Sequence, residues 1–498
     1  MKEFTPLLNI STVLESLDHT KGIGPKKKRV ICKAIERFSF SNTLGKINIF
    51  DLLKIKTIGP KIFNNLAHSI YTNDDPITLV VVVSQILTSL SIKEGQGSNY
   101  MTVSELLKDV AELSQYIEEK DLRAYLRWAH KQNLIDYSST SEIITKNGHL
   151  SRCYRGLKTL ESLAHSGRTL PPDFKNPKIS QDDLSGEQLV ALEHSLRPGL
   201  NFIAAGPGSG KTHLISKIVG NALKISTSIL IIAPTKLAVK NIKERSGILP
   251  TTLQGFLKNR EDFEDYQFDF IVIDESSLVD ESAFLTILNY THQNTSLIMV
   301  GDPYQNSSVL PGRTFYELLV HHKDLNIFLK KNFRMTNAQS GKLCEYLRQA
   351  PSFSKKDIWR ITNNNPSFKA SLKWIGVYHQ EQITMNIINV AVNNPNKDYL
   401  VVSPKNTGTY GVLELQKVIS ESGVSNITVS TPAKSQGLQF DGVFILLMRS
   451  HQFLIKRESV YTAATRSRDN IWILSDTSYI RFYQQKRNGL LGHLLGQN

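Results

Sequence analysis

The sequence contains little cysteine, and its three cysteines, Cys32, Cys153 and Cys344, lie far apart along the chain. They do not form the close pairs that hold a structural zinc ion, and so few thiols are typical of a reducing compartment. Long apolar stretches are lacking too, since no run approaches the roughly 18 residues that cross a bilayer. The first residues, MKEFTPLLNI, lack the charged and apolar regions of a signal peptide. We therefore expect a soluble intracellular protein without structural zinc.

Negative charge is in deficit, with 59 Lys and Arg against 45 Asp and Glu, for a net charge of +14. Lysine and arginine that neutralise phosphates release condensed counterions, so this excess favours a polyanionic partner. A basic surface that serves solubility alone is the alternative. The 498 residues, 40% of them hydrophobic, are typical of a globular protein with about three or four domains.

Residues 205–212, AGPGSGKT, stand between the apolar run NFIA and the helical stretch HLISKIVGNAL. Small residues let such a loop curl until several backbone N–H groups converge on phosphates at the electropositive start of a helix. Lys211 would reach the β- and γ-phosphates, and the hydroxyl of Thr212 would hold Mg²⁺. The loop therefore predicts ATP or GTP chemistry, and its predicted nucleotide-binding residues are Gly206, Gly208, Ser209, Gly210, Lys211 and Thr212.

Short apolar runs alternate with helical stretches from Leu184 onward. One set is NFIA, ILIIA, FIVID, LIMVG and IFLK, and a second is YLVVS, ITVS, VFILL and IWIL. Buried parallel strands have this composition, and they bind ligands at their carboxyl ends. The two sets predict an α/β fold with two RecA-like lobes.

Two of the predicted strands of the first lobe end in polar residues that can act on a phosphate. FIVIDESS ends in Asp274, which would bind Mg²⁺ through water, and Glu275, which would orient and deprotonate the attacking water. VGDPYQ places Gln305 where it could sense the γ-phosphate. The alternative is that this sequence only forms a turn around Asp302 and Pro303 at the end of the strand. The predicted cofactors are ATP and Mg²⁺.

Two segments near the start, GIGPKKKRVICKAI and IKTIGPKIFNNLA, each place a Gly-Pro turn between helical stretches. Each resembles a helix-hairpin-helix, whose free N–H groups bind a nucleic-acid phosphate without reading sequence. The first copy predicts DNA contacts at Gly22, Gly24 and Lys26, while the second has Thr57 in place of the first glycine. Two helix turns that only pack are the alternative.

A second amino-terminal unit follows KEGQGSN. Leu122, Leu126 and Ala129 recur there at helical spacing, and EIITKNGHLSRC predicts a β-hairpin about Asn147 and Gly148. Helices followed by a hairpin suggest a winged-helix-like module, which could bind DNA or only pack against its neighbours. The predicted order is a helix-hairpin-helix region at 1–95, this module at 96–165, a linker at 166–183, and lobes at 184–330 and 331–498.

Nine ordered segments resemble the successive motifs of superfamily 1 helicases, over about residues 184–474. They are LSGEQLVAL, AGPGSGKT, IIAPTKLAVK, TTLQGFL, VIDESSLVD, VGDPYQNSSVLPG, KNFRMT, STPAKSQGLQF and VYTAATRSR. The chain is most similar to the RecD-like branch, whose members move 5′ to 3′ on single-stranded DNA. The resemblance implies a DNA helicase of repair, recombination or replication, intracellular and of bacterial or viral type.

Residue roles follow from this resemblance position by position. It assigns Gln188 to the adenine edge, Arg334 and Arg466 to arginine fingers from the second lobe, and Gln436 and Gly437 to the interface between the lobes. A guanidinium can stabilise the charge on γ-phosphoryl oxygens, so the arginine roles are physically sensible. The residues implied to track the DNA backbone are Pro234, Thr235, Thr252, Thr431 and Ser435.

The chain departs from the family pattern in two ways. Ala433 replaces a usual His and Gln439 a usual Glu, which weakens the implied DNA contact and lobe coupling there. Only ten residues separate Leu257 from Phe268 and fifteen separate Leu415 from Thr431, where relatives carry a duplex-splitting hairpin and an SH3-like domain. The implied partners are single-stranded DNA, strand junctions and proteins of a repair, recombination or defence complex. An ATP-gated DNA-binding or sensor subunit with little unwinding is the alternative function, and RNA is the alternative substrate.

Overall fold

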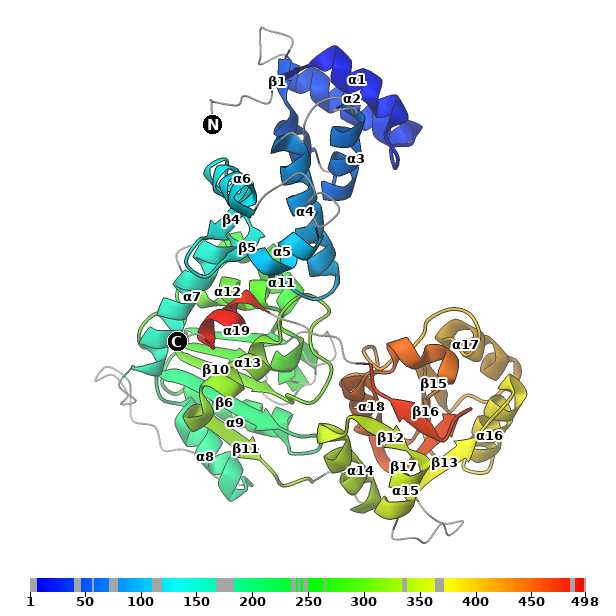
Figure 1. Ribbon diagram of the computed structural model, residues 1–498. Helices are drawn as coiled ribbons and strands as arrows, with labels where there is room; N and C mark the ends of the chain where they lie inside the picture. The colour runs from blue at the N-terminus through cyan, green and yellow to red at the C-terminus, as the bar shows by residue number, and fades with distance from the viewer. Residues whose placement is uncertain are drawn as a thin grey trace. The chain divides into compact units, whose positions relative to one another are not determined.

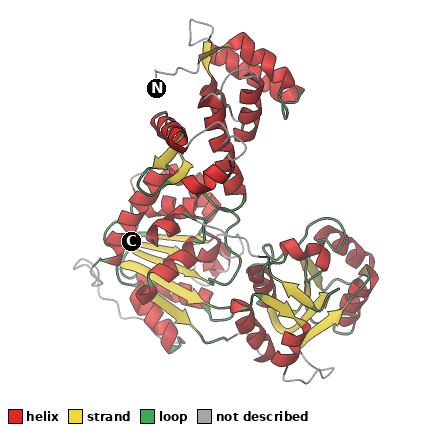
Figure 2. Cartoon of the chain, viewed as in Figure 1, coloured by secondary structure: helices red, strands yellow, loops and turns green. Residues whose placement is uncertain are grey.

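The computed structural model describes residues 7–39, 46–55, 58–70, 79–109, 119–166, 183–233, 239–240, 242–244, 250–263, 266–333, 338–362, 371–483 and 489–496. The chain forms two compact units, one of residues 1–154 with 487–490 and one of 155–486 with 491–498. Figure 1 shows the elements of both units in chain order, and Figure 2 shows that most strands belong to the second.

The first unit is mainly helical, with two small antiparallel sheets, β1-β2 and β3-β5-β4. Its elements are β1 (Leu7–Asn9), α1 (Ile10–His19), α2 (Pro25–Ser39), β2 (Lys46–Asn48), η1 (Ile49–Lys54), α3 (Pro60–Ile70), α4 (Leu79–Gly95), β3 (Tyr100–Thr102), α5 (Val103–Asp109), α6 (Glu119–Lys131), β4 (Ile135–Ser138), β5 (Ile143–Lys146) and the start of α7 (His149–Ala164). Both Gly-Pro sequences lead into a helix, since α2 and α3 begin at their prolines, a residue favoured in the first helical turn.

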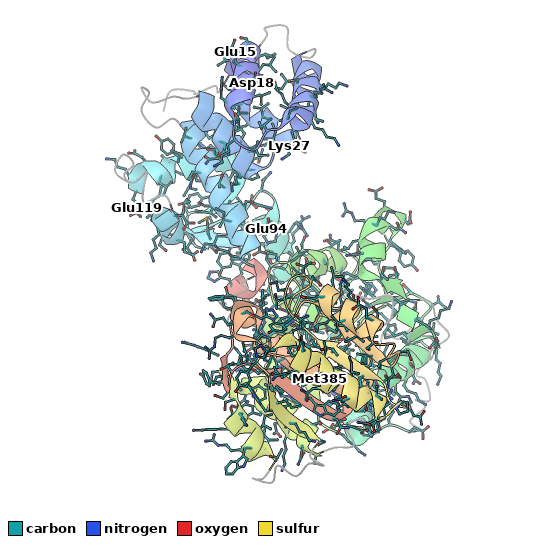
Figure 3. All side chains as sticks on the ribbon, turned by 90° about the vertical axis from the view of Figure 1, so that its right-hand side faces the viewer. Glu15, Asp18, Lys27, Glu94, Glu119 and Met385 are labelled. Atoms are coloured by element: carbon teal, nitrogen blue, oxygen red, sulfur yellow. The ribbon has the colours of Figure 1, made fainter. Side chains whose placement is uncertain are left out.

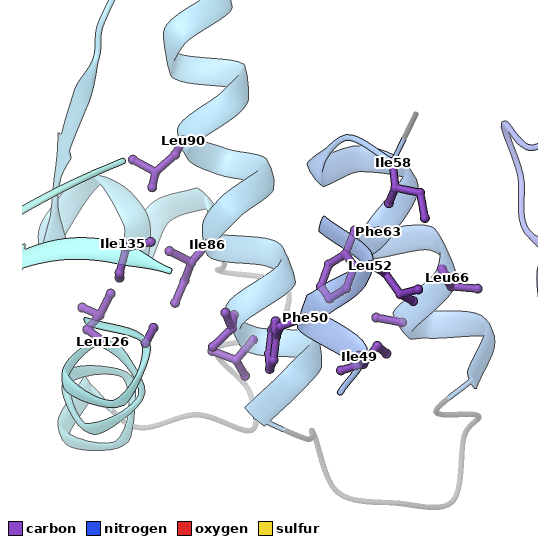
Figure 4. Close-up of a cluster of buried hydrophobic side chains, with 14 of the residues drawn as sticks. Ile49, Phe50, Leu52, Ile58, Phe63, Leu66, Ile86, Leu90, Leu126 and Ile135 are labelled. Carbon is purple, nitrogen blue, oxygen red and sulfur yellow. The ribbon is translucent and has the colours of Figure 1, made fainter. Parts of the chain in front are cut away.

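One apolar cluster joins the parts of the first unit, from Val13 on α1 to Ile144 on β5. The rings of Phe50 and Phe63 lie 5.6 Å apart within it, and Figure 4 shows both rings together with Leu126 on α6. Charged side chains such as Asp18 and Lys27 are exposed, as Figure 3 shows. The sequences predicted as a helix-hairpin-helix region and as a winged-helix-like module therefore share one hydrophobic core.

The predicted hairpin about Asn147 and Gly148 is wrong. Strand β5 ends at Lys146 and α7 begins at His149, so the Asn-Gly pair starts a helix. β5 pairs antiparallel with β3 and with β4, and the turn between β4 and β5 includes Glu142 at a φ of 54°. Gly148 has a φ of 76°, and such a left-handed glycine serves a helix start as well as the hairpin turn that its sequence suggested.

The first lobe of the second unit contains a parallel sheet of six strands in the order β11-β6-β10-β9-β7-β8. One of its faces packs on α8 and α9, through residues such as Leu192, Ile203 and Leu214. The elements are α8 (Gly186–Ser195), β6 (Gly199–Ala205), α9 (Lys211–Ala222), β7 (Ile229–Ala233), β8 (Thr251–Thr252), α11 (Leu253–Lys258), η2 (Arg260–Phe263), β9 (Phe270–Ile273), η3 (Ser276–Leu278), α12 (Glu281–Leu288), β10 (Ser296–Gly301), α13 (Thr314–His321), η4 (Lys323–Leu325) and β11 (Asn326–Leu329).

The second lobe contains a parallel sheet of five strands in the order β13-β17-β16-β14-β15. Alternate strand residues pack on α14, α15 and α18 on one face and on α16 and α17 on the other. The elements are α14 (Ala338–Gln349), β12 (Ser352–Ser354), α15 (Lys355–Ile361), β13 (Leu372–Gly376), α16 (Gln380–Val392), β14 (Tyr399–Val402), α17 (Val412–Glu421), β15 (Ile427–Ser430), β16 (Phe440–Leu446), η5 (Arg449–Leu454), α18 (Arg457–Ala464), β17 (Ser467–Ser475), β18 (Tyr479–Arg481) and α19 (Leu490–Leu495). The prediction of two parallel α/β lobes is confirmed.

Gly442 on β16 has no room for a side chain. A β-carbon there would lie 2.5 Å from Trp472 Cζ3 and 2.9 Å from two ring atoms of Tyr399, and flat rings in a packed core cannot move aside. We expect Gly442→Ala to lower the free energy of unfolding of the second unit by about 1–3 kcal/mol, measured by denaturant titration. Gly376→Ala in the same sheet is the control, because a β-carbon there meets no atom within 4 Å. Equal stability of both variants would contradict the prediction.

Candidate functional site

The phosphate loop lies between β6, which ends at Ala205, and α9, which begins at Lys211. Gly208 and Gly210 have φ angles of 73° and 79°, a conformation that side chains disfavour. Gly210 also has no room, since a β-carbon there would lie 2.6 Å from Gln188 Nε2. The backbone of the predicted loop therefore requires glycine at these positions. The free N–H groups in the first turn of α9 form a site for an anion.

Three hydrogen bonds hold the carbonyl groups of this loop. Gln188 Nε2 donates to the Ser209 carbonyl over 2.9 Å, the Phe333 N–H donates to the Gly208 carbonyl over 2.8 Å, and the Ser209 hydroxyl donates to the Gly206 carbonyl over 2.8 Å. Gln188 Oε1 accepts from the Ser185 N–H over 3.0 Å. The amide of Gln188 thus bonds the protein at both ends, and its contact with adenine stays a prediction. The Phe333 ring, which sequence reasoning missed, is 55% exposed beside this loop.

Asp274 and Glu275 follow β9 directly, as predicted. The Asp274 carboxylate is buried and accepts the N–H of Glu275 over 2.8 Å. Burial, and then the negative charge of Glu275, raises the pKa of Asp274 to about 7. Glu275 has a φ of 48°, which is uncommon outside glycine and concentrates at functional positions. Its Oε2 lies 3.9 Å from Lys211 Nζ.

The donor set beside the loop fits Mg²⁺. Thr212 on α9 offers a hydroxyl oxygen and Asp274 offers carboxylate oxygens, and oxygen ligands are what this hard cation prefers. Because the burial of Asp274 disfavours its charged form, a nearby cation would stabilise that form. The predicted ligands therefore lie on neighbouring elements with suitable chemistry.

Polar side chains of the two lobes meet next to the phosphate loop. Gln436 Nε2, from the second lobe, donates to Gln305 Oε1 over 3.2 Å and approaches Glu275 Oε2 at 3.4 Å. The Tyr461 hydroxyl donates to Asp302 Oδ2 over 2.9 Å, while Gln305 Nε2 donates to the same oxygen over 3.2 Å. Burial raises the pKa of Asp302. Glu275 and Gln305, predicted from strand ends, thus share a hydrogen-bond network with the predicted interface residue Gln436.

Two further contacts extend this interface. The N–H of Asn306 donates to Thr462 Oγ1 over 3.0 Å, and the Ser459 hydroxyl donates to Asn306 Oδ1 over 3.1 Å. Sequence reasoning missed these residues and also Tyr461, because each is an ordinary helix or loop residue until the lobes pack together. Segment 302–306 of the first lobe therefore contacts α18.

The two predicted arginine fingers differ in what the structure shows. Arg334 lies outside the described residues. Arg466 is 3% exposed, and its Nε donates to the Thr462 carbonyl over 3.0 Å while its Nη2 donates to Thr465 Oγ1 over 2.8 Å. A weaker bond of 3.4 Å joins its Nη1 to the Leu438 carbonyl. Arg466 is therefore bonded within its own lobe.

The predicted DNA-contacting residues of the lobes differ in their burial and in their hydrogen bonds. Thr252 caps α11 by accepting the Gly255 N–H over 2.9 Å, and Thr431 accepts the Lys434 N–H over 3.4 Å. The Ser435 side chain is fully buried and donates to the Pro432 carbonyl over 2.8 Å. Pro234 and Thr235 lie outside the described residues. Ser435 could act on DNA only through the segment that it holds.

The remaining predicted positions are glycines and one lysine. Gly437 follows Gln436 with a φ of 84°, so its backbone conformation favours glycine. In the first unit Gly22 has a φ of 95° in the turn between α1 and α2, and a β-carbon on Gly24 would meet no atom within 4 Å. Lys26 is exposed in the first turn of α2. The DNA roles of these residues stay predictions.

Two family models match the second unit. Residues 183–354 match an AAA domain, and residues 426–474 match a UvrD-like helicase C-terminal domain. Among the described residues, no helix is both long and apolar enough to cross a membrane.

Two curated relatives are bacterial proteins. The chain is 26% identical over 172 residues to an ATP-dependent RecD2 DNA helicase of Deinococcus radiodurans, a match that covers 32% of this chain and 24% of that protein. It is 22% identical over 404 residues to the RecBCD enzyme subunit RecD of Mycolicibacterium smegmatis, covering 59% of this chain and 72% of the relative. The chain thus spans only about a quarter of the length of the RecD2 helicase that it matches.

Solved structures give a weaker likeness. A Pif1 helicase from Bacteroides, in complex with ADP-AlF3 and ssDNA, is 16% identical, with a TM-score of 0.34 over 59% of this chain and 92% of the other.

Proposed function

Because this chain is related to the RecD-type superfamily 1 helicases, we propose that it is an ATP-dependent DNA helicase or translocase that moves 5′ to 3′ on single-stranded DNA. The observation that carries the proposal is the network in which Gln436 of the second lobe contacts both Gln305 and Glu275 beside the phosphate loop. Both first-lobe residues would face the γ-phosphate. Hydrolysis would therefore change the contacts that Gln436 of the second lobe makes with them. The proposed setting is DNA repair, recombination or replication.

The proposed chemistry uses the residues around the loop. ATP bound there supplies the phosphoanhydride bond, and Mg²⁺ held by Thr212 and Asp274 would neutralise its phosphates. Lys211 would bind the β- and γ-phosphates, and Glu275 would orient a water and accept its proton. The exposed ring of Phe333 and the amide of Gln188, which flank Gly210, support binding of the base.

We further propose that DNA contacts lie on both units. Thr252 and Thr431, together with Pro234 and Thr235, would contact the backbone of the strand along the lobes. In the first unit, the exposed basic residues Lys26, Lys27 and Arg29 at the start of α2 support a phosphate contact at the Gly22 turn. This turn would hold DNA without reading its sequence.

ATP hydrolysis by the purified chain, measured with and without single-stranded DNA, tests the proposal. We expect stimulation by DNA, and unwinding of a 5′-tailed duplex in preference to a 3′-tailed one. Hydrolysis that does not rise with DNA contradicts the proposal, and preference for the 3′ tail contradicts the direction. Matched RNA strands in competition would identify the preferred nucleic acid.

An ATP-gated DNA-binding or sensor subunit of a larger complex is the second candidate function. It is favoured by the short segments between the motifs, since residues 416–430 hold only the end of α17, a turn and β15. Such a chain would close its lobes on ATP yet separate strands poorly. Robust unwinding of a 5′-tailed duplex by the isolated chain excludes this function.

The predicted arginine fingers can be tested by substitution. We expect Arg334→Ala and Arg466→Ala to lower kcat by roughly 10²-fold or more with a smaller change in nucleotide affinity, because a finger acts on charge that develops in the transition state. Steady-state kinetics and a nucleotide-binding titration measure the two effects. An equal loss of both would show ground-state binding instead.

A further inference from the structure

Arg348, near the end of α14, lies against the phosphate loop although α14 belongs to the second lobe. Its Nη2 atom is 3.0 Å from the position that a β-carbon on Gly206 would take, and Gly206 is the first loop residue after β6. A side chain at position 206 would therefore crowd the guanidinium. The guanidinium therefore reaches from one lobe to the start of the loop in the other.

The surroundings of Arg348 hold its side chain in this direction. The guanidinium carbon lies 5.5 Å from the centre of the Tyr304 ring, a cation–π geometry. Although burial alone would lower it, the pKa of Arg348 is raised by Tyr461 and Asp302, so the charge is retained. Tyr304 belongs to the first lobe and Tyr461 to the second, and both pack with the apolar core of the second lobe.

Arg348 also has an unused donor. Among the described residues its buried Nε atom has no hydrogen-bond partner, and no carboxylate forms an ion pair with it. A buried donor without an acceptor is destabilising, and more so when it is charged. Arg466 differs, because its Nε and Nη2 atoms bond Thr462 and Thr465 of its own lobe. Of these two second-lobe arginines, Arg348 is the one with a free donor near the loop.

We propose that Arg348 binds the terminal phosphate of the nucleoside triphosphate, as a phosphate-binding residue of the second lobe in addition to the predicted fingers. The inference rests on the proposed function, since it requires that the loop bind a triphosphate. A planar guanidinium suits phosphate oxygens, and the acceptor would satisfy the donor that is now unpaired. A diphosphate lacks the group that Arg348 would contact, so Arg348 distinguishes ATP from ADP. Because Arg348 lies on α14, the contact between α14 and the phosphate loop depends on which nucleotide is bound.

Nucleotide-binding titrations test this role apart from turnover. Fluorescent ADP and a fluorescent non-hydrolysable ATP analogue, each with Mg²⁺ and without DNA, would be titrated into the full chain and its Arg348→Gln and Arg348→Lys variants. We expect Arg348→Gln to weaken binding of the ATP analogue about tenfold or more and to change ADP binding less than twofold. Arg348→Lys should bind the ATP analogue more tightly than Arg348→Gln but less tightly than the unmodified chain. Lysine keeps the positive charge but lacks the planar, two-pronged donor geometry of the guanidinium.

Lys342→Gln is the matched control, since Lys342 is exposed on the same helix. Unchanged binding of the ATP analogue in Arg348→Gln would overturn the inference. An equal loss for both nucleotides would also overturn it, because Arg348 would then only support the loop. If Arg348→Gln lowers the melting temperature so far that the variant is unfolded during the titration, Arg348→Lys serves in its place. The comparison is then the loss of affinity for the ATP analogue against the loss of affinity for ADP. Failure of the unmodified chain to bind either nucleotide would instead reject the proposed function.

Discussion

Glu275→Gln should reduce ATP turnover by roughly 10²-fold or more while nucleotide binding survives. The substitution removes the carboxylate that would accept a proton from the attacking water, and such acid–base groups contribute about 10²–10⁴ in rate. The amide keeps the size of the side chain and an oxygen that can still accept from Gln436. Phosphate release after ATP addition, with and without DNA, measures turnover.

Two neighbours explain why binding should survive or tighten. The Glu275 charge is one cause of the raised pKa of Asp274, so its removal favours the ionised Asp274 that a cation needs. Lys211, 3.9 Å from Glu275, would also lose a competing anion and remain free for phosphate. Glu261→Gln, the same change at an exposed residue of η2, is the control. Turnover near that of the unmodified chain would mean that another group activates the water.

The strands of the lobes could be predicted from sequence because buried parallel strands are almost wholly apolar. All nine apolar runs, from NFIA in β6 to IWIL in β17, are strands of the two sheets. β13 escaped notice because it lies at an edge of its sheet, and its residues 373–376 are only partly buried or exposed. Its mixed composition, LKWIG, is what such a position permits.

The first-lobe half of the site was predictable for a related reason. Asp274, Glu275 and Gln305 follow strands that the sequence reveals, and parallel strands bring their carboxyl ends to one edge. Tyr461 and Arg348 could not be predicted, because their contacts depend on how the second lobe packs against segment 302–306. No local sequence pattern predicts how the two lobes pack together.

Removal of Lys211 should have the largest effect on nucleotide binding. Its ammonium lies near three acidic side chains, since it lowers the pKa of Asp274 and of Asp302 and approaches Glu275. Without this positive charge, the acidic groups would repel a triphosphate and no side chain of the loop would neutralise it. We expect Lys211→Ala to weaken ATP binding roughly 10²-fold and to remove measurable turnover.

The control for this prediction is Lys217→Ala, which removes the same charge from the same helix, α9, farther from the loop. Titration with the fluorescent ATP analogue measures binding, and the melting temperature shows whether the variant is folded. ATP binding within threefold of the unmodified chain would contradict a phosphate contact of Lys211. Lys211→Ala should fail at binding and Glu275→Gln only at hydrolysis. Together the two substitutions would therefore separate the proposed phosphate contact of Lys211 from the proposed activation of water by Glu275.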